Sequence, residues 1–131
     1  MNNKIYTNLN DCINEVLSLS SNYACEGVEK SIGGPFGAGI IQKIGNSYKI
    51  ICIERNTVIS SKDATSHAEV NAIRKASKIL NRRNLNDCIL VSTAKSCPMC
   101  LSASCWANIP VIYYSVDYSE ATASGFRDDA I

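Results

Sequence analysis

Residues 88–116 read CILVSTAKSCPMCLSASCWANIPVIYYSV and predict the centre of the fold. Two short apolar runs, at 88–92 and 111–116, are typical of buried strands. Between them, residues 98–107 fit a short helix with Pro98 near its first turn, where a missing N–H is tolerated. A strand, a helix and a second strand in this order indicate a βαβ crossover.

The segment upstream predicts a hairpin. Residues 38–44 and 48–54 are rich in β-branched residues, and Gly45-Asn46-Ser47 separates them. Two such runs around a short turn-forming segment are typical of antiparallel strands.

Two longer amphipathic helices are predicted, at about 10–30 and about 65–81, because apolar residues recur there at three- and four-residue steps. Their candidate N-caps are Asn10 or Asp11 for the first helix and Thr65 or Ser66 for the second. Continuous apolar strands imply a sheet that is covered on both faces. We therefore expect an α/β protein, a three-layer α/β/α sandwich around a mixed sheet.

Composition narrows the class of protein. A chain of 131 residues is one domain, 1–131, by length. Its 46% hydrophobic and 19% charged residues exclude a disordered or fibrous chain. The formal net charge of +1 disfavours a dedicated nucleic-acid binder.

Seven cysteines, an odd number, indicate free thiols or metal ligands rather than a disulfide framework. Apolar stretches fall short of the ~20 residues that cross a bilayer, and residues 1–6 lack the apolar core of a signal peptide. We expect a soluble, cytoplasmic protein without a membrane partner.

Two short clusters form a candidate metal site: His67-Ala68-Glu69 and Cys97-Pro98-Met99-Cys100. Two thiolates and one imidazole suit a tetrahedral Zn²⁺ whose fourth position stays open for water, which is typical of catalytic zinc. Because zinc lowers the pKa of bound water to roughly 7, Glu69 could shuttle its protons as a general acid and base.

Other interpretations of these clusters remain. The CxxC pair could be a redox dithiol with a lowered cysteine pKa, although that leaves His67 and Glu69 unexplained. A closed structural zinc site would need a fourth ligand, and the chain offers neither a second CxxC nor a second histidine. The other five cysteines fit buried small hydrophobic positions.

The spacing H-x-E followed by C-x-x-C resembles the cytidine deaminase superfamily, and the flanking blocks resemble its bacterial guanine deaminase branch. Those blocks are Gly33 to Ala38, Asn56, Ala64 to Val70, Ala72 to Ala76, Cys97 to Leu101, Trp106, and Gly125-Phe126 with Asp128. The resemblance implies a cytidine deaminase-like fold with a central mixed five-stranded sheet, a homodimer, and hydrolysis of guanine to xanthine and ammonia.

The resemblance also implies roles for individual residues. His67, Cys97 and Cys100 would hold one zinc ion per chain, and Glu69 would be the proton shuttle. Asn56, the N–H of Ala68 and Asp128 would contact the purine base, and Asp128 would help to move protons. Trp106 would either wall the pocket or fill the core. Without the resemblance, Asn56 would be interpreted as a turn residue and Asp128 as a solvated acid.

The sequence differs from the guanine deaminase branch in two places that could change which substrate is bound. Lys95-Ser96 stands where Glu-Pro is usual, which reverses a charge beside the site. The chain stops at Ile131, whereas the branch continues into a tail that closes the pocket. The alternatives are therefore deamination of another free base or nucleoside, such as cytosine or another aminopurine, deamination of tRNA adenosine, and a lapsed zinc-binding module.

Overall fold

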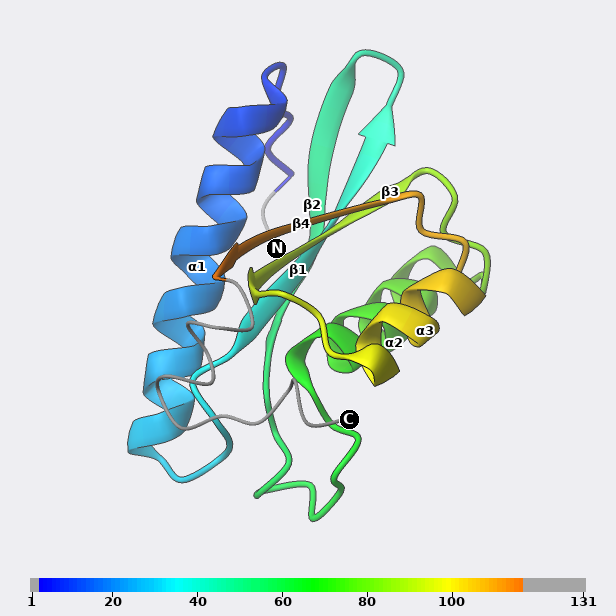
Figure 1. Cartoon of the computed structure of the whole chain (residues 1–131). Helices are drawn as coiled ribbons and strands as arrows, with labels where there is room; N and C mark the ends of the chain where they lie inside the picture. The colour runs from blue at the N-terminus through cyan, green and yellow to red at the C-terminus, as the bar shows by residue number, and fades with distance from the viewer. Residues whose placement is uncertain (1–2, 117–131) are drawn as a thin grey trace.

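The computed structural model describes residues 3–116, and it contains each helix and strand expected in that range. In chain order the elements are α1 (Leu9–Glu29), β1 (Gly37–Ile44), β2 (Ser47–Arg55), α2 (Ala68–Leu80), β3 (Cys88–Ala94), α3 (Pro98–Trp106) and β4 (Val111–Val116). Figure 1 shows α1 on one side of the strands and α2 and α3 on the other.

The sheet is mixed, as expected, with strand order β2-β1-β3-β4. β1 pairs antiparallel with both β2 and β3, whereas β3 and β4 are parallel and α3 connects them. The βαβ crossover is thereby confirmed. Residues 3–116 form four strands, so the fifth strand that the resemblance implies has no counterpart in the described part of the chain.

Both faces of the sheet are buried, which confirms the three layers. Ile40 and Ile41 are consecutive on β1, point to opposite faces, and are both fully buried. Ile41 packs in a cluster with Val16 of α1, and Ile40 packs in a second cluster with Ala72 of α2. The two clusters place one core under α1 and the other under α2.

The N-caps differ from the expected ones. Asn8 caps α1, and its side chain accepts a hydrogen bond from the N–H of Asp11. The N-cap of α2 is His67, because Thr65 is held in a turn by the Asp63 carboxylate, which accepts from its N–H and its hydroxyl. His67 makes no side-chain capping bond. Its ring faces two cysteines instead.

No helix in the described range 3–116 is both long enough and apolar enough to cross a membrane.

Candidate zinc and substrate site

Two helix N-termini meet at the candidate metal site. His67 is the N-cap of α2, Cys97 is the N-cap of α3, and Cys100 lies in the first turn of α3. The Nδ1 of His67 lies 3.5 Å from the Sγ of Cys97 and 3.5 Å from the Sγ of Cys100. The possible ligand atoms of the three residues all lie within 4.8 Å of one another.

This arrangement fits a tetrahedral zinc ion. With Zn–N near 2.0–2.1 Å and Zn–S near 2.3 Å, the edge between nitrogen and sulfur ligands of a tetrahedron is about 3.6 Å. The two measured nitrogen–sulfur distances of 3.5 Å agree with that edge. The structure therefore brings together the ligand set that the sequence predicts.

The protonation of the thiols also favours a cation. A hydrogen bond from Cys100, together with one from His67, lowers the pKa of the Cys97 thiol to about 4. The hydrogen bond to Cys97 and burial raise the pKa of the Cys100 thiol. The lowered pKa favours the thiolate form of Cys97, which is the form of cysteine that binds zinc.

Glu69 lies in the first turn of α2 and is only 7% exposed. Burial raises the pKa of its carboxyl group to about 7, although hydrogen bonds with its own N–H and with Ser96 act in the opposite direction. It does not belong to the ligand group of His67, Cys97 and Cys100. A carboxyl group that holds or releases a proton near neutral pH suits a general acid and base.

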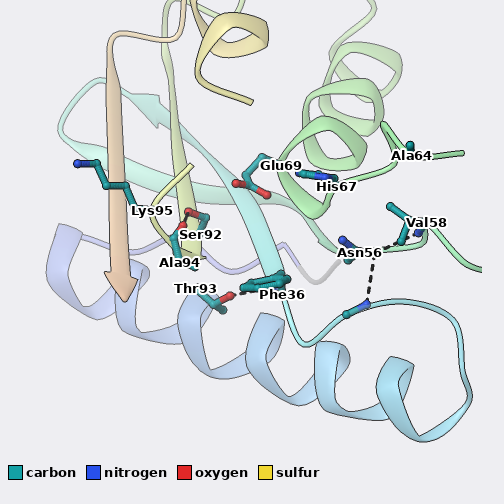
Figure 2. A pocket seen from close by; sticks show the side chains of 12 residues that line it. Phe36, Asn56, Val58, Ala64, His67, Glu69, Ser92, Thr93, Ala94 and Lys95 are labelled. Carbon is teal, nitrogen blue, oxygen red and sulfur yellow. Dashed lines mark hydrogen bonds between the residues drawn. The ribbon is translucent and has the colours of Figure 1, made fainter. Parts of the chain in front are cut away.

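A cavity of about 410 Å³ adjoins this group. His67 and Glu69 line it, and so does Asn56 (Figure 2). Its remaining lining residues are Gly34, Phe36, Gly37, Val58, Ala64, Ser92, Thr93, Ala94 and Lys95. The volume falls within the range of small-molecule sites.

The side chain of Asn56 is held by backbone donors. Its Oδ1 accepts from the N–H of Val58 at 3.0 Å and from the N–H of Gly34 at 3.4 Å (Figure 2). A Cβ at Gly33 would lie 2.1 Å from the carbonyl oxygen of Asn56, so only glycine fits there. Because its oxygen is occupied, Asn56 offers its NH₂ group as a donor to the cavity.

Residues 10–116 match the cytidine and deoxycytidylate deaminase zinc-binding region. The chain belongs to this family of zinc-dependent deaminases. His67, Cys97 and Cys100 are the zinc-ligand group of the deaminase.

Two members of related enzyme groups are similar to this chain over more than half of its length. Guanine deaminase of Bacillus subtilis is 48% identical over 108 residues, which is 82% of this chain and 67% of that protein. The X-ray structure of that enzyme superposes with a TM-score of 0.80 at 44% identity and covers 88% of this chain and 71% of its own. A tRNA-specific adenosine deaminase of Rickettsia typhi is 30% identical over 68% of this chain, which spans 59% of that relative.

The other expected site residues have different outcomes. Ala68 is buried at the first position of α2, where its N–H has no intrahelical acceptor. Asp128 lies outside the described residues. Trp106 is 88% exposed and does not line the cavity, so within the described chain it neither walls the pocket nor fills the core. The buried positions of α3 are Cys100 and Ser104, four residues apart, and Trp106 lies off that face.

Sequence reasoning did not assign the remaining lining residues to the site. Phe36 belongs to a block that carries the resemblance, but its sequence position alone does not show that it faces the zinc group. Thr93 comes from β3, and its Oγ1 accepts from the N–H of Gly37 across the sheet. Lys95, which the sequence places beside the site, lines the cavity, and its Nζ lies 5.8 Å from the ring centroid of Tyr114.

Proposed function

We propose that the chain acts as a single deaminase domain that catalyses the zinc-dependent hydrolysis of guanine to xanthine and ammonia. Guanine is proposed as the substrate because the chain is 48% identical to the guanine deaminase of Bacillus subtilis. The chemistry is supported by a ligand group for zinc, a buried carboxyl group and a cavity that lie together.

A zinc ion in this site supplies the Lewis acidity that makes water nucleophilic at neutral pH. Glu69 carries the protons. Its carboxylate takes a proton from the water that adds to C2 of guanine and returns it to the amino nitrogen on the same carbon. The C2–N bond then breaks, and the nitrogen leaves as ammonia. A carboxyl group with a pKa near 7 can both accept and donate the proton.

The polar groups around the cavity suit a purine base. Asn56 offers an NH₂ donor, and the N–H of Ala68 offers a second donor at the start of α2. Guanine carries acceptors at O6, N3 and N7, so two donors can hold it in one orientation. We also propose that Asp128 contacts the polar edge of the base and acts as a second proton carrier.

A homodimer and a cytoplasmic location are part of the proposal. Leu101 and Trp106 of α3 are 48% and 88% exposed, and apolar groups of this size are commonly covered by a partner. All seven cysteines are free, which is usual in a reducing compartment.

Deamination of adenosine in tRNA is the second candidate. It is favoured by the relative in Rickettsia typhi and by three basic residues of α2, Arg74, Lys75 and Lys78. They line one hollow together with Glu54, Thr57 and Asn71. The formal net charge of +1 gives little general attraction to RNA.

A substrate panel tests the proposal. Ammonia release is measured with purified, zinc-analysed protein on guanine, other aminopurines, cytosine, their nucleosides and tRNA, with Glu69→Gln as the blank. The proposal expects guanine to be the preferred substrate. Preference for another base or for tRNA would replace guanine with that substrate, and zinc without turnover of any substrate would indicate a binding module.

A further inference from the structure

Asn71 lies in the α2 helix, four residues after His67 and two after Glu69. Its side chain points out of the helix toward the end of β2. The Nδ2 of Asn71 lies 2.9 Å from the carbonyl oxygen of Arg55, 3.0 Å from Oγ1 of Thr57 and 3.3 Å from the carbonyl oxygen of Ser66.

These three acceptors belong to the two halves of the site. Arg55 and Thr57 flank Asn56, the residue that we propose contacts the base. Ser66 immediately precedes His67, the zinc ligand, and its carbonyl oxygen also accepts from the N–H of Thr57 at 3.0 Å. One amide group therefore connects the segment that carries Asn56 to the segment that carries His67.

The segment that carries Asn56 is also anchored from the opposite face of the sheet. The guanidinium of Arg55 lies 4.0 Å from the ring centroid of Tyr23 on α1, and its Nη1 donates to the carbonyl oxygen of Tyr23 at 3.2 Å. The end of β2 is thus fixed to α1 by Arg55 and to α2 by Asn71. Of these two anchors, only Asn71 belongs to the helix that begins beside His67.

We propose that Asn71 is a positioning residue that fixes Asn56 relative to the His67–Glu69 end of the site, and thereby places C2 of guanine against the reacting groups. This inference rests on the proposed function. Misplacement of a reacting atom by a fraction of an ångström is costly in a preorganised site. The geometry requires a donor at position 71, because the carbonyl oxygens of Arg55 and Ser66 can only accept.

Asn71→Asp and Asn71→Ala separate positioning from packing. Aspartate has the shape of asparagine, but its ionised carboxylate donates nothing and faces two carbonyl oxygens. We expect kcat for guanine to fall at least tenfold in both variants, and further in Asn71→Asp, while zinc stays at about one per chain. Asn8→Ala, which removes the α1 cap far from the site, is the control for general loss of stability.

Amide hydrogen exchange provides a readout that needs no substrate. The N–H of Thr57 donates to Ser66, and the N–H of Val58 donates to Oδ1 of Asn56. We expect the exchange of these two amides to speed up at least tenfold in Asn71→Asp and to stay unchanged in Asn8→Ala. Unchanged exchange at both amides in Asn71→Asp would overturn the positioning role, even if the protein proved inactive on guanine.

A double-mutant cycle of Asn71→Ala with Asn56→Ala tests whether Asn71 acts through Asn56. If Asn71 acts through Asn56, Asn71→Ala costs less than threefold in kcat/KM once Asn56 has been removed. Fully multiplicative losses, or unchanged kcat in the Asn71 variants, would refute the positioning role. Failure of the unmodified protein to deaminate guanine would instead refute the proposed function and leave the exchange measurement to decide the role of Asn71.

Discussion

The Nδ1 of His67 lies 3.5 Å from the Sγ of Cys97, although the two residues are 30 positions apart in the chain. The contact exists because α2 and α3 begin at the same end of the molecule, on the same side of the sheet. Each residue is the N-cap of its helix, and neither uses its side chain to cap it. The side chains are therefore available for zinc.

Replacement of a zinc ligand is expected to remove the metal. In Cys97→Ser the hydroxyl stays protonated at neutral pH and is a poor zinc ligand, so zinc should fall from about one to less than a tenth per chain. Elemental analysis after dialysis measures this. Cys25→Ser, at an exposed cysteine, is the control and should retain the metal. Full zinc occupancy in Cys97→Ser would remove Cys97 from the ligand set.

Glu69→Gln is expected to separate zinc binding from turnover. Glutamine keeps the shape of the side chain but cannot carry a proton, so zinc content should be unchanged while kcat falls by roughly 10²- to 10⁴-fold. Zinc analysis and ammonia release on the same sample measure both quantities. A variant with normal kcat would assign the proton transfer to another group.

Gly33→Ala is expected to weaken guanine binding by more than a general loss of protein stability would. The new Cβ would lie 2.1 Å from the carbonyl oxygen of Asn56, so this residue must move. Gly45→Ala is the matched control, because Gly45 has a φ of +59° in the β1–β2 hairpin with open space around it. It should cost about 1–2 kcal/mol of stability without a change in KM.

Guanine KM and melting temperature, measured for both glycine variants, distinguish the two effects. We expect KM to rise at least fivefold in Gly33→Ala only. An equal KM in the two variants would show that the contact between Gly33 and Asn56 does not matter for the base.

The ionised side chain of Asp87 is expected to stabilise the folded protein, and this stabilisation should be lost at acidic pH. Partial burial raises the pKa of Asp87, but hydrogen bonds from Arg82 and Gln42 outweigh it and lower the pKa from 3.8 to about 2. The ionised form is therefore favoured in the folded state. The stabilisation is complete above pH 3.8 and disappears as the pH falls toward 2.

The comparison with Asp87→Asn measures this contribution. Because both partners of the ion pair are about one third exposed, the difference in unfolding free energy should be about 1 kcal/mol or less near neutral pH. Urea unfolding between pH 2 and 7 should show the difference shrinking below about pH 4. A difference that stays constant down to pH 2 would show that the carboxylate charge is not its source.

Local sequence patterns predicted the elements and the zinc ligands well. Apolar periodicity identified the two long helices, and short apolar or β-branched runs between turn residues identified the strands. The ligands could be named because soft donors at helix starts are chemically distinctive. The N-cap of α2 was expected at Thr65 or Ser66, because these residue types commonly cap helices. The N-cap is His67 instead, whose side chain makes no capping hydrogen bond and faces the metal site.

Local sequence patterns could not predict contacts between residues that are far apart in the chain. The amide of Asn71 joins residues 55, 57 and 66, and nothing in its neighbours along the chain indicates those partners. Trp106 shows the opposite error: the interpretation as a core residue was wrong, because Trp106 is 88% exposed and the helix buries Cys100 and Ser104 instead. Which face of a short apolar helix is covered depends on the rest of the fold.

This zinc-dependent deaminase is expected to convert guanine into xanthine. The most direct measurement is xanthine formation from guanine by the purified protein, followed by absorbance, with zinc and ammonia determined on the same sample. We expect about one zinc per chain, one xanthine and one ammonia for each guanine consumed, and loss of turnover after chelation that zinc restores. Full zinc occupancy with no xanthine formed would show that guanine is not the substrate of this protein.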